Sequence, residues 1–404
     1  MMKNILAAFL LLSIMVFVGL RLSKPSAHFQ NPYPVFCDFV AEKIFISDEE
    51  LTSWKKTCHS RSRLVTEKSP PELLIKDMNN VLGILGVSHL EIFAPQEVKS
   101  IWKGENSETG IEAQFVDSEL IVFKVHPASP AADAGIKKGD IVRSINGEQP
   151  NPWDVRTQTG IYEVVQGGVL TDIYLKARSI VRAEGISVQR FNDQSAQLAV
   201  PSFRSSYFDE KNLDRLREDL KKYKKIVVDL RGNAGGNFVA GLRFLSLFMC
   251  ESQEVGKLIK PKFPEEVSAE LPNTLQDTEQ LKVLDVSKEV VLRTYQNSNC
   301  YKGIVRVLVD GRTASVAELV AQALKDYRQA TVEGAPSRGH LLVGVWYPMP
   351  EVGQGVEISI PEAVYETTLG RRIEHHGVEV DRVLYYDIAE MQAGIDSWVK
   401  NALD

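Results

Sequence analysis

The spacing of apolar residues changes character along this 404-residue chain. An unbroken apolar run fills positions 5–20. Between residues 31 and 105, apolar residues recur three and four positions apart, a spacing typical of amphipathic helices. From 106 to 182, short runs separated by turns predict strands, and from 185 to 404 strand-like runs alternate with helix-like ones. We therefore expect a helical region, a β-rich domain and an α/β core behind an N-terminal segment.

The apolar run at the N-terminus follows Lys3 and is closed by Arg21 and Lys24. A basic start before a run of this length matches an export signal, either a signal peptide cleaved from residues 1–27 or a membrane anchor. Both alternatives place the body of the protein in the cell envelope, periplasmic or otherwise outside the cytoplasm. Membrane attachment would then rest on residues 5–20.

The helical region offers one clear helix start. Ser69 precedes two prolines and Glu72, and apolar residues then follow at helical spacing as far as Leu82. A serine that caps a helix, with an acid in the first turn, is a common N-terminal signal. We expect a helix that begins directly after Ser69.

Four alternating runs predict the strands of the β-rich domain. The third ends at Asn146-Gly147, a dipeptide favoured in tight hairpin turns. The expected strands are 111–115, 119–125, 141–145 and 171–176.

In the last 220 residues, the alternation of strand and helix patterns predicts an α/β layer with a mainly parallel sheet. The expected strands are 197–200, 226–230, 305–309 and 331–333, and the expected helices are 210–222, 238–248 and 317–327. A charged stretch with prolines at 251–299 interrupts the alternation. It is interpreted either as a flap beside the active site or as a solvated surface insertion.

The charge and the cysteine and histidine content of the chain exclude some classes of function. The net charge of −6 and the isoelectric point near 5.8 give no basic surface for nucleic acid. Four cysteines suggest the disulfides Cys37–Cys58 and Cys250–Cys300 in an oxidising compartment, although three pairings or free buried thiols are open from sequence. No residues have the spacing of zinc ligands, and His375-His376 lacks a third ligand.

Two distant segments carry candidate chemistry: the glycine-rich turn 229–237 after a strand, and 313–319 before a helix. Ser315 lies at a strand-to-helix junction, where the helix N-terminus favours an anionic intermediate. Backbone N–H groups of Val316 and of Gly235 or Gly236 would bind the oxyanion. Asp229 and Arg231 are interpreted as anchors of the turn, and Glu318 as a capping acid.

The β-rich domain resembles a PDZ domain. The shared motifs are Ser129-Pro130-Ala131, Ala134-Gly135, Gly139-Asp140-Ile141 and Ile145-Asn146-Gly147. The resemblance implies that an extended peptide adds as a strand, with its carboxylate held by the loop that contains Gly110, Ile111 and Glu112. Glu112 departs from the pattern, because relatives carry glycine there.

The order of a helical region, a PDZ domain and a core with both catalytic segments is similar to that of the C-terminal processing peptidases, or tail-specific proteases. The resemblance implies a ClpP/crotonase-like core and a Ser-Lys pair. The lysine is absent here, because its place is taken by Arg338-Gly339-His340. The glutamine that usually follows falls on Gly344.

A different base is therefore expected. Ser88-His89 and Glu374 resemble the motifs of the tricorn protease core, which implies a tetrad of Ser315, His89, Ser88 and Glu374. A neutral imidazole suits this role because its ordinary pKa lies near ~6.5. His340 is the alternative base.

These observations predict an exported serine endopeptidase that cleaves envelope proteins near their C-termini, with the PDZ domain sensing or gating the substrate. The expected partners are protein or peptide substrates, without nucleic acid, metal or cofactor, and a homo-oligomer is left open. The alternative is a catalytically silent PDZ scaffold that binds C-terminal tails. A weaker alternative is a core that acts on a non-peptide ligand.

Overall fold

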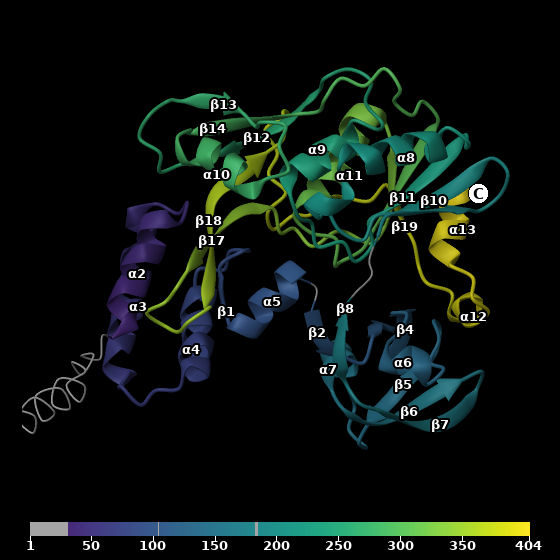
Figure 1. Cartoon of the computed structure of the whole chain (residues 1–404), viewed down its shortest axis with the longest axis horizontal. Helices are drawn as coiled ribbons and strands as arrows, with labels where there is room; N and C mark the ends of the chain where they lie inside the picture. Colours follow the sequence, from purple (N-terminus) through teal and green to yellow (C-terminus); the bar gives the residue numbers. More distant parts are fainter. Residues whose placement is uncertain (1–30, 104, 182–184) are drawn as a thin grey trace, which may run out of the picture.

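A computed structural model describes residues 31–103, 105–181 and 185–404 (Figure 1). The expected signal segment lies outside these residues. The predicted fold class is confirmed: a helical N-terminal region, a β-rich domain and an α/β core follow one another along the chain. Within the described ranges, no helix has the length and apolar character needed to cross a membrane.

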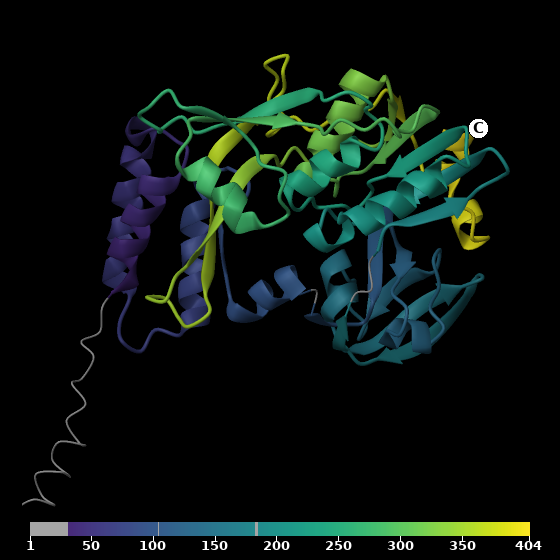
Figure 2. The same ribbon diagram turned by 45° about the horizontal axis from the view of Figure 1, so that its top comes forward.

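The N-terminal region lies beside the core (Figure 2), and its described residues 31–103 contain four α-helices and one short 3-10 helix. A disulfide joins Cys37 to Cys58, and the Trp54 indole donates to the Val81 carbonyl at 2.9 Å. The elements are α2 (Pro32–Lys43), α3 (Asp48–Ser60), η1 (Arg61–Leu64), α4 (Pro71–Gly83), β1 (Glu91–Phe93) and α5 (Pro95–Lys103). The predicted cap was wrong, because Pro70 caps α4 without a side-chain bond, whereas the Ser69 hydroxyl accepts from Thr66 N–H.

A long hairpin of β17 (Leu342–Pro348) and β18 (Glu357–Glu366) extends from the core to the helical region. β18 pairs with β1 and buries Ile358 and Ile360 in the apolar cluster of α2, α3 and α4. The sequence patterns did not predict this hairpin, which ties the two regions together.

The β-rich domain contains a five-stranded antiparallel sheet in the order β3-β4-β5-β6-β7. The four predicted strands are present, and Gly160–Gln166 (β6) is an additional one. The elements are β2 (Glu105–Glu108), β3 (Ile111–Val116), β4 (Glu119–Val125), α6 (Pro130–Asp133), β5 (Ile141–Ile145), α7 (Pro152–Thr157), β7 (Val169–Leu175) and β8 (Arg178–Val181).

The core sheet has the order β19-β16-β15-β11-β10-β9 and is parallel except for β9. Its buried aliphatic rows face α8, α9 and α11 on one side, whereas Val227 and Leu308 face α13 on the other. The elements are β9 (Ser187–Arg190), β10 (Ser195–Ala199), η2 (Ser205–Tyr207), α8 (Glu210–Leu220), β11 (Lys225–Asp229), α9 (Phe238–Leu245), β15 (Ile304–Val309), α11 (Val316–Arg328), β16 (Thr331–Gly334), β19 (Arg382–Val383), α12 (Ile388–Gln392) and α13 (Ser397–Leu403).

The stretch 251–299 is neither a flap nor a solvated insertion. Its strands join β18 in a second, mixed sheet, and Leu258, Val290 and Leu292 are buried in the main core cluster. The disulfide Cys250–Cys300 closes the stretch. Its elements are β12 (Glu254–Ile259), β13 (Ser268–Glu270), α10 (Asp277–Asp285) and β14 (Glu289–Arg293). Charged residues masked its alternating apolar positions.

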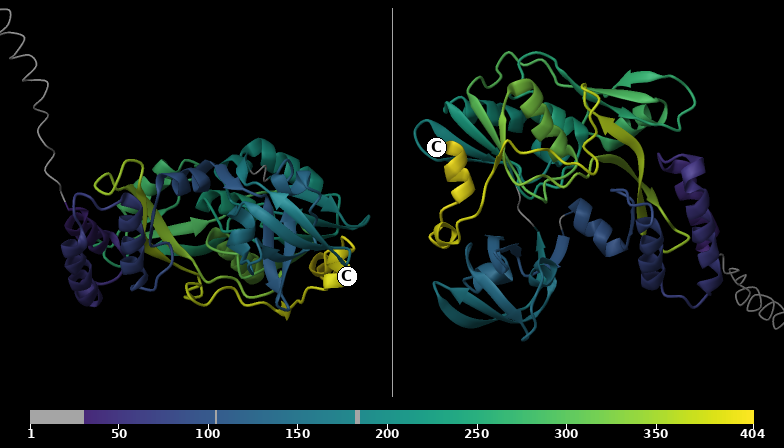
Figure 3. Two further views of the ribbon diagram at one scale, coloured as in Figure 1. Left: turned by 90° about the horizontal axis from the view of Figure 1, so that it is seen from below. Right: turned by 180° about the vertical axis from the view of Figure 1, so that it is seen from behind.

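The C-terminal segment lies between the β-rich domain and the core (Figure 3). The Phe123 ring packs edge-on against Tyr386 at 4.6 Å, and Met391 is buried with Ile121 and Ile141. Because the Tyr386 ring also stacks on Trp398 at 4.2 Å, this segment fixes the domain to the sheet.

Candidate active site

Ser315 lies directly before α11, in the turn that follows β15. Its backbone has φ +57° and ψ −130°, a conformation that residues other than glycine rarely adopt. The residue is 8% exposed. Strain of this kind in a non-glycine residue persists only where surrounding contacts impose it, and it occurs often at active sites.

The contacts that impose this conformation converge on Glu318. Its buried carboxylate accepts hydrogen bonds from the backbone N–H groups of Ser315, Gly339 and His340 and from the Ser337 hydroxyl, at 2.6–3.0 Å. Burial raises the pKa of Glu318, and these four bonds oppose that effect. Glu318 therefore does more than cap a helix, because it holds the turn that contains Ser315 against the segment 337–340.

The glycine-rich turn packs directly against Ser315. A Cβ on Gly235 would lie 2.7 Å from Ser315 Cβ and 2.9 Å from Val316 N, and one on Gly236 would meet the Phe203 backbone at 2.5 Å. Only glycine therefore fits at these positions. The N–H of Gly235 donates to Asn233 Oδ1 at 2.8 Å. Of the expected oxyanion donors, this leaves Gly236 and Val316, whose N–H groups have no acceptor among the described residues.

Asp229 and Arg231 anchor this turn. The guanidinium of Arg231 donates to Asp229 at 2.6 Å and to Asp396 at 2.9 Å, and it lies 5.6 Å from the Trp398 ring. Arg231 is thereby held between a core strand and the C-terminal segment. Both residues are positioned as structural anchors, away from Ser315 itself.

Ser88, His89 and Glu374 form a continuous hydrogen-bonded chain. Ser88 Oγ lies 2.8 Å from His89 Nδ1 and 2.9 Å from Glu374 Oε2, and Glu374 Oε1 also accepts the Ser88 N–H at 3.1 Å. A carboxylate only accepts, so the single hydroxyl proton goes to Glu374, and Ser88 Oγ accepts from Nδ1–H. His89 Nε2 is then the unprotonated nitrogen.

One peptide group connects this chain to the nucleophile. The carbonyl of His340 accepts the Ser315 N–H at 2.9 Å, and the N–H of Leu341, at the other end of the same peptide group, donates to Glu374 at 2.8 Å. Ser315 and Glu374 are therefore held on opposite ends of a single planar unit. Of the expected tetrad, Ser88, His89 and Glu374 are joined by direct hydrogen bonds, and Ser315 is linked to Glu374 through this peptide group.

The environment of His89 favours the neutral imidazole. Its pKa is lowered to about 4, chiefly by burial; the Glu374 charge opposes this shift, and the charges of His340 and Arg338 add to it. The His89 backbone is itself strained, with φ +59°. A neutral, fixed imidazole is the form that can accept a proton from a serine hydroxyl.

His340, the alternative base, lies near but is held differently. Burial and then the Arg338 charge lower the pKa of His340. Its backbone is bonded to Glu318 and Ser315, whereas its ring has no orienting acceptor within the described part of the chain. His375 and His376 lie in the turn beside Glu374, where His376 Nδ1 contacts the Glu374 carbonyl.

Gly344 makes room for His89. A Cβ at this position would meet His89 Cβ at 3.1 Å and Ser359 Oγ at 2.6 Å. A side chain here would therefore displace the imidazole. The position at which the expected glutamine is absent is therefore the one that leaves space for His89.

The expected peptide loop of the β-rich domain begins β3. Gly110 has φ +87°, and a Cβ would overlap the Ser129 side chain at 2.1 Å. Glu112 lies 2.7 Å from His126 Nε2 and 3.5 Å from Arg312, which belongs to the turn before Ser315. The side chain of Glu112 thus links the peptide loop to the nucleophile turn.

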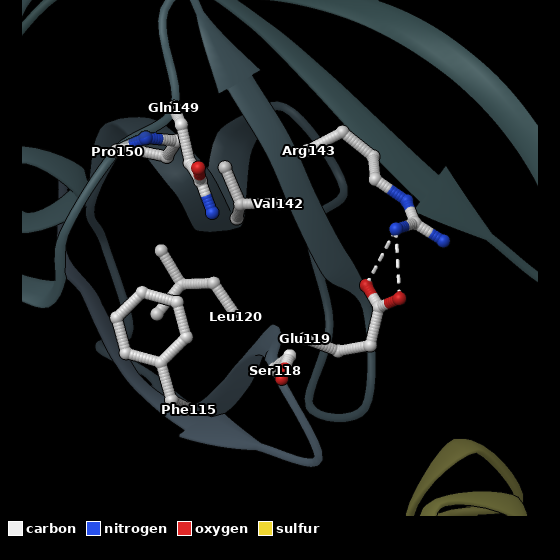
Figure 4. Close-up of a pocket in the computed structure, with 8 residues that line it drawn as sticks. All are labelled: Phe115, Ser118, Glu119, Leu120, Val142, Arg143, Gln149 and Pro150. Carbon is white, nitrogen blue, oxygen red and sulfur yellow. Dashed lines mark hydrogen bonds and ion pairs between the residues drawn. The ribbon is translucent and has the colours of Figure 1, made fainter.

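A shallow hollow also lies on the β-rich domain (Figure 4). Phe115, Leu120 and Val142 line it, and the ion pair of Arg143 with Glu119, at 2.7 Å, forms one side. None of its lining residues belongs to the segments around Ser315 or His89, so it is separate from the candidate active site.

A β-rich domain of this topology, joined to an α/β core with a serine at a strand-to-helix turn, is the arrangement of a serine peptidase with a PDZ domain. Residues 121–169 match the PDZ domain. Residues 167–384, more than half of the chain, match peptidase family S41, and the chain belongs to that family.

Two relatives of the chain are named as proteases. The chain is 24% identical to a carboxy-terminal-processing protease of Bartonella bacilliformis over 83% of this chain and 75% of the relative. It is 25% identical to a probable CtpA-like serine protease of Staphylococcus saprophyticus over 69% of this chain and 54% of that protein. The chain therefore spans only about half of the staphylococcal relative.

Solved structures share the fold. The photosystem II D1 C-terminal processing protease gives a TM-score of 0.56 at 16% identity, covering 89% of this chain and 94% of the other. Mature CPAF complexed with lactacystin gives 0.62 at 11% identity, covering 92% and 96%. At such low identity these likenesses show the architecture alone.

Three contributions to the site were not predicted. The Ser337 hydroxyl is one of the four donors to the Glu318 carboxylate. Gly344 leaves space for the His89 side chain. Asp396 accepts a hydrogen bond from the Arg231 guanidinium. Only the contact with Ser337 could have been sought from the sequence, because Glu318 stands three residues after Ser315 and a buried carboxylate there needs hydrogen-bond donors. The other two are contacts between segments distant in sequence.

Proposed function

We propose that this protein is an exported endopeptidase of the cell envelope in which Ser315 is the nucleophile and His89 the general base. The observation that carries the proposal is the Ser88 hydroxyl, placed between His89 Nδ1 and Glu374. It fixes the tautomer of His89, so that Nε2 can take the Ser315 proton. Glu374 then stabilises the imidazolium that forms.

The remaining steps follow from the same geometry. The N–H groups of Gly236 and Val316 bind the negative charge that develops on the attacked carbonyl oxygen. His89 then protonates the leaving amine, and in the second half of the reaction it activates water to hydrolyse the acyl-enzyme on Ser315. The PDZ domain binds a segment of the substrate near its C-terminus and so senses or gates its entry.

Labelling with a serine-directed fluorophosphonate tests the proposal on the purified full chain. Wild type should label, Ser315→Ala should not, and His89→Ala should label at least about 100-fold more slowly because it lacks the base. His340→Ala is the matched control and should label at a rate near that of wild type.

Two outcomes would contradict it. If His89→Ala labels like wild type while His340→Ala does not, the base is His340. If wild type neither labels nor cleaves unfolded protein, the chain is a silent scaffold.

A further inference from the structure

Three aromatic side chains form a cluster on the sheet beside the candidate active site. The Phe93 and Trp346 rings stack at 4.6 Å and 19°, and Trp102 of α5 meets Trp346 edge-on at 5.1 Å. Trp102 is 53% exposed, and Phe93 and Trp346 are only partly buried. Aromatic surface left open to water in this way commonly marks a binding site.

Strand register shows which face the cluster occupies. β18 lies between β1 and β17, and Ser359 pairs with both Glu91 and Trp346, so these three residues share one face. Ile358 pairs with Ile92 and Tyr347 on the opposite face, which packs against the helices. The aromatic cluster therefore faces away from the helical core.

The same face leads to His89. Gly344 lies two residues before Trp346 on β17, so both belong to this face, about 7 Å apart along the strand. The space above Gly344 is filled by His89 and Ser359. The aromatic surface therefore begins one side-chain repeat from the proposed base.

We infer that Phe93, Trp102 and Trp346 form a subsite that receives a large apolar side chain of the peptide substrate, aromatic or branched aliphatic, beside the scissile bond. This inference rests on the proposed function. Continuity with His89 identifies the occupant, because a peptide side chain beside a bond attacked next to His89 lies within reach of Trp346 on the same face. Glu91 lies on the same face without an ion-pair partner among the described residues, so an acidic side chain there meets like charge.

The test uses a library of peptides from a digested proteome, with the cleavage products read by mass spectrometry. Wild type should enrich Phe, Trp, Tyr or Leu and exclude Asp and Glu at one position flanking the cut. Two peptides that differ only by Phe or Ala at that position should differ at least about tenfold in kcat/KM. Trp346→Ala and Trp102→Ala should each reduce that ratio several-fold.

Trp153→Ala, which removes an exposed tryptophan of the β-rich domain, is the matched control and should keep the ratio. The rate of fluorophosphonate labelling shows that each variant retains an assembled site, and Phe93→Leu replaces any variant that does not. If wild type labels and cleaves without an apolar preference, or both tryptophan variants keep it, the subsite is overturned while the proposed function stands. If wild type neither labels nor cleaves, both fail.

Discussion

At the scale of single residues, the site depends on how charges surround one imidazole. Burial is the main reason that His89 is neutral, and the positive Arg338 side chain, which has no ion pair of its own in the described structure, adds to this effect against the opposing charge of Glu374. A cation near a histidine disfavours its protonation. The acid limit of the reaction is therefore set by groups that do no chemistry themselves.

Replacing Arg338 with Gln should move the acid limb of the kcat/KM profile to higher pH. In wild type, activity should fall only as the pH drops toward about 4, where His89 becomes protonated. Removal of the positive charge raises the pKa of His89, so protonation begins at a higher pH. The measurement is kcat/KM against pH, with Arg143→Gln as a control that should leave the limb in place. An unmoved limb in Arg338→Gln would separate Arg338 from the base.

At the scale of elements, the hairpin β17–β18 connects two regions that the sequence patterns treat as separate. It carries Gly344 under His89 and packs its other face into the helices. The disulfides act at the same scale. Cys37–Cys58 joins two helices of that region, and Cys250–Cys300 closes the stretch that adds strands to the mixed sheet.

Removing the Cys250–Cys300 bond in a Cys250→Ala, Cys300→Ala variant should lower the free energy of unfolding by about 3–4 kcal/mol. The bond closes a loop with a sequence separation of 50, and a constraint on so long a loop removes much entropy from the unfolded chain. Urea titration followed by tryptophan fluorescence measures the change. A loss below about 1 kcal/mol would show that the packing of β12 and β14 already holds the stretch closed.

Much of the architecture could be predicted because apolar residues recur at regular spacings in the buried strands and helices of the core. The glycine-rich turn and Ser315 were also visible, since their residue types are restrictive. The hairpin was not, because Gly344, Pro348 and a charged, glycine-containing turn interrupt its pattern. Contacts such as Arg231 with Asp396 join residues 165 positions apart, and no local pattern records such a pairing.

At the scale of the whole molecule, the β-rich domain is connected to the active-site turns by charged contacts. Lys138 donates to Asp396 at 2.9 Å, and Asp396 also accepts from Arg231. Arg231 and Lys138 hold the pKa of Asp396 well below its usual range, against the effect of burial. The C-terminal segment therefore joins the β-rich domain to the core both by aromatic packing and by ion pairs.

Replacing Asp396 with Asn should cost about 3 kcal/mol of stability, because it leaves the buried Arg231 with one carboxylate in place of two. Lys138→Met removes the partly exposed partner and should cost less than about 1 kcal/mol. Chemical denaturation of both variants at neutral pH provides the comparison. Equal, small losses would show that Arg231 is held by Asp229 alone.

The chain that joins Ser88 to Glu374 spans 286 positions. A polypeptide that is synthesised from its N-terminus presents Ser88 and His89 long before Glu374 is available. Until that last partner arrives, the Ser88 hydroxyl has no carboxylate to accept its proton, so its orientation toward His89 Nδ1 is not fixed. The hydrogen-bonded chain at the site is therefore completed only when residue 374 joins the fold, after Ser315 itself has been made.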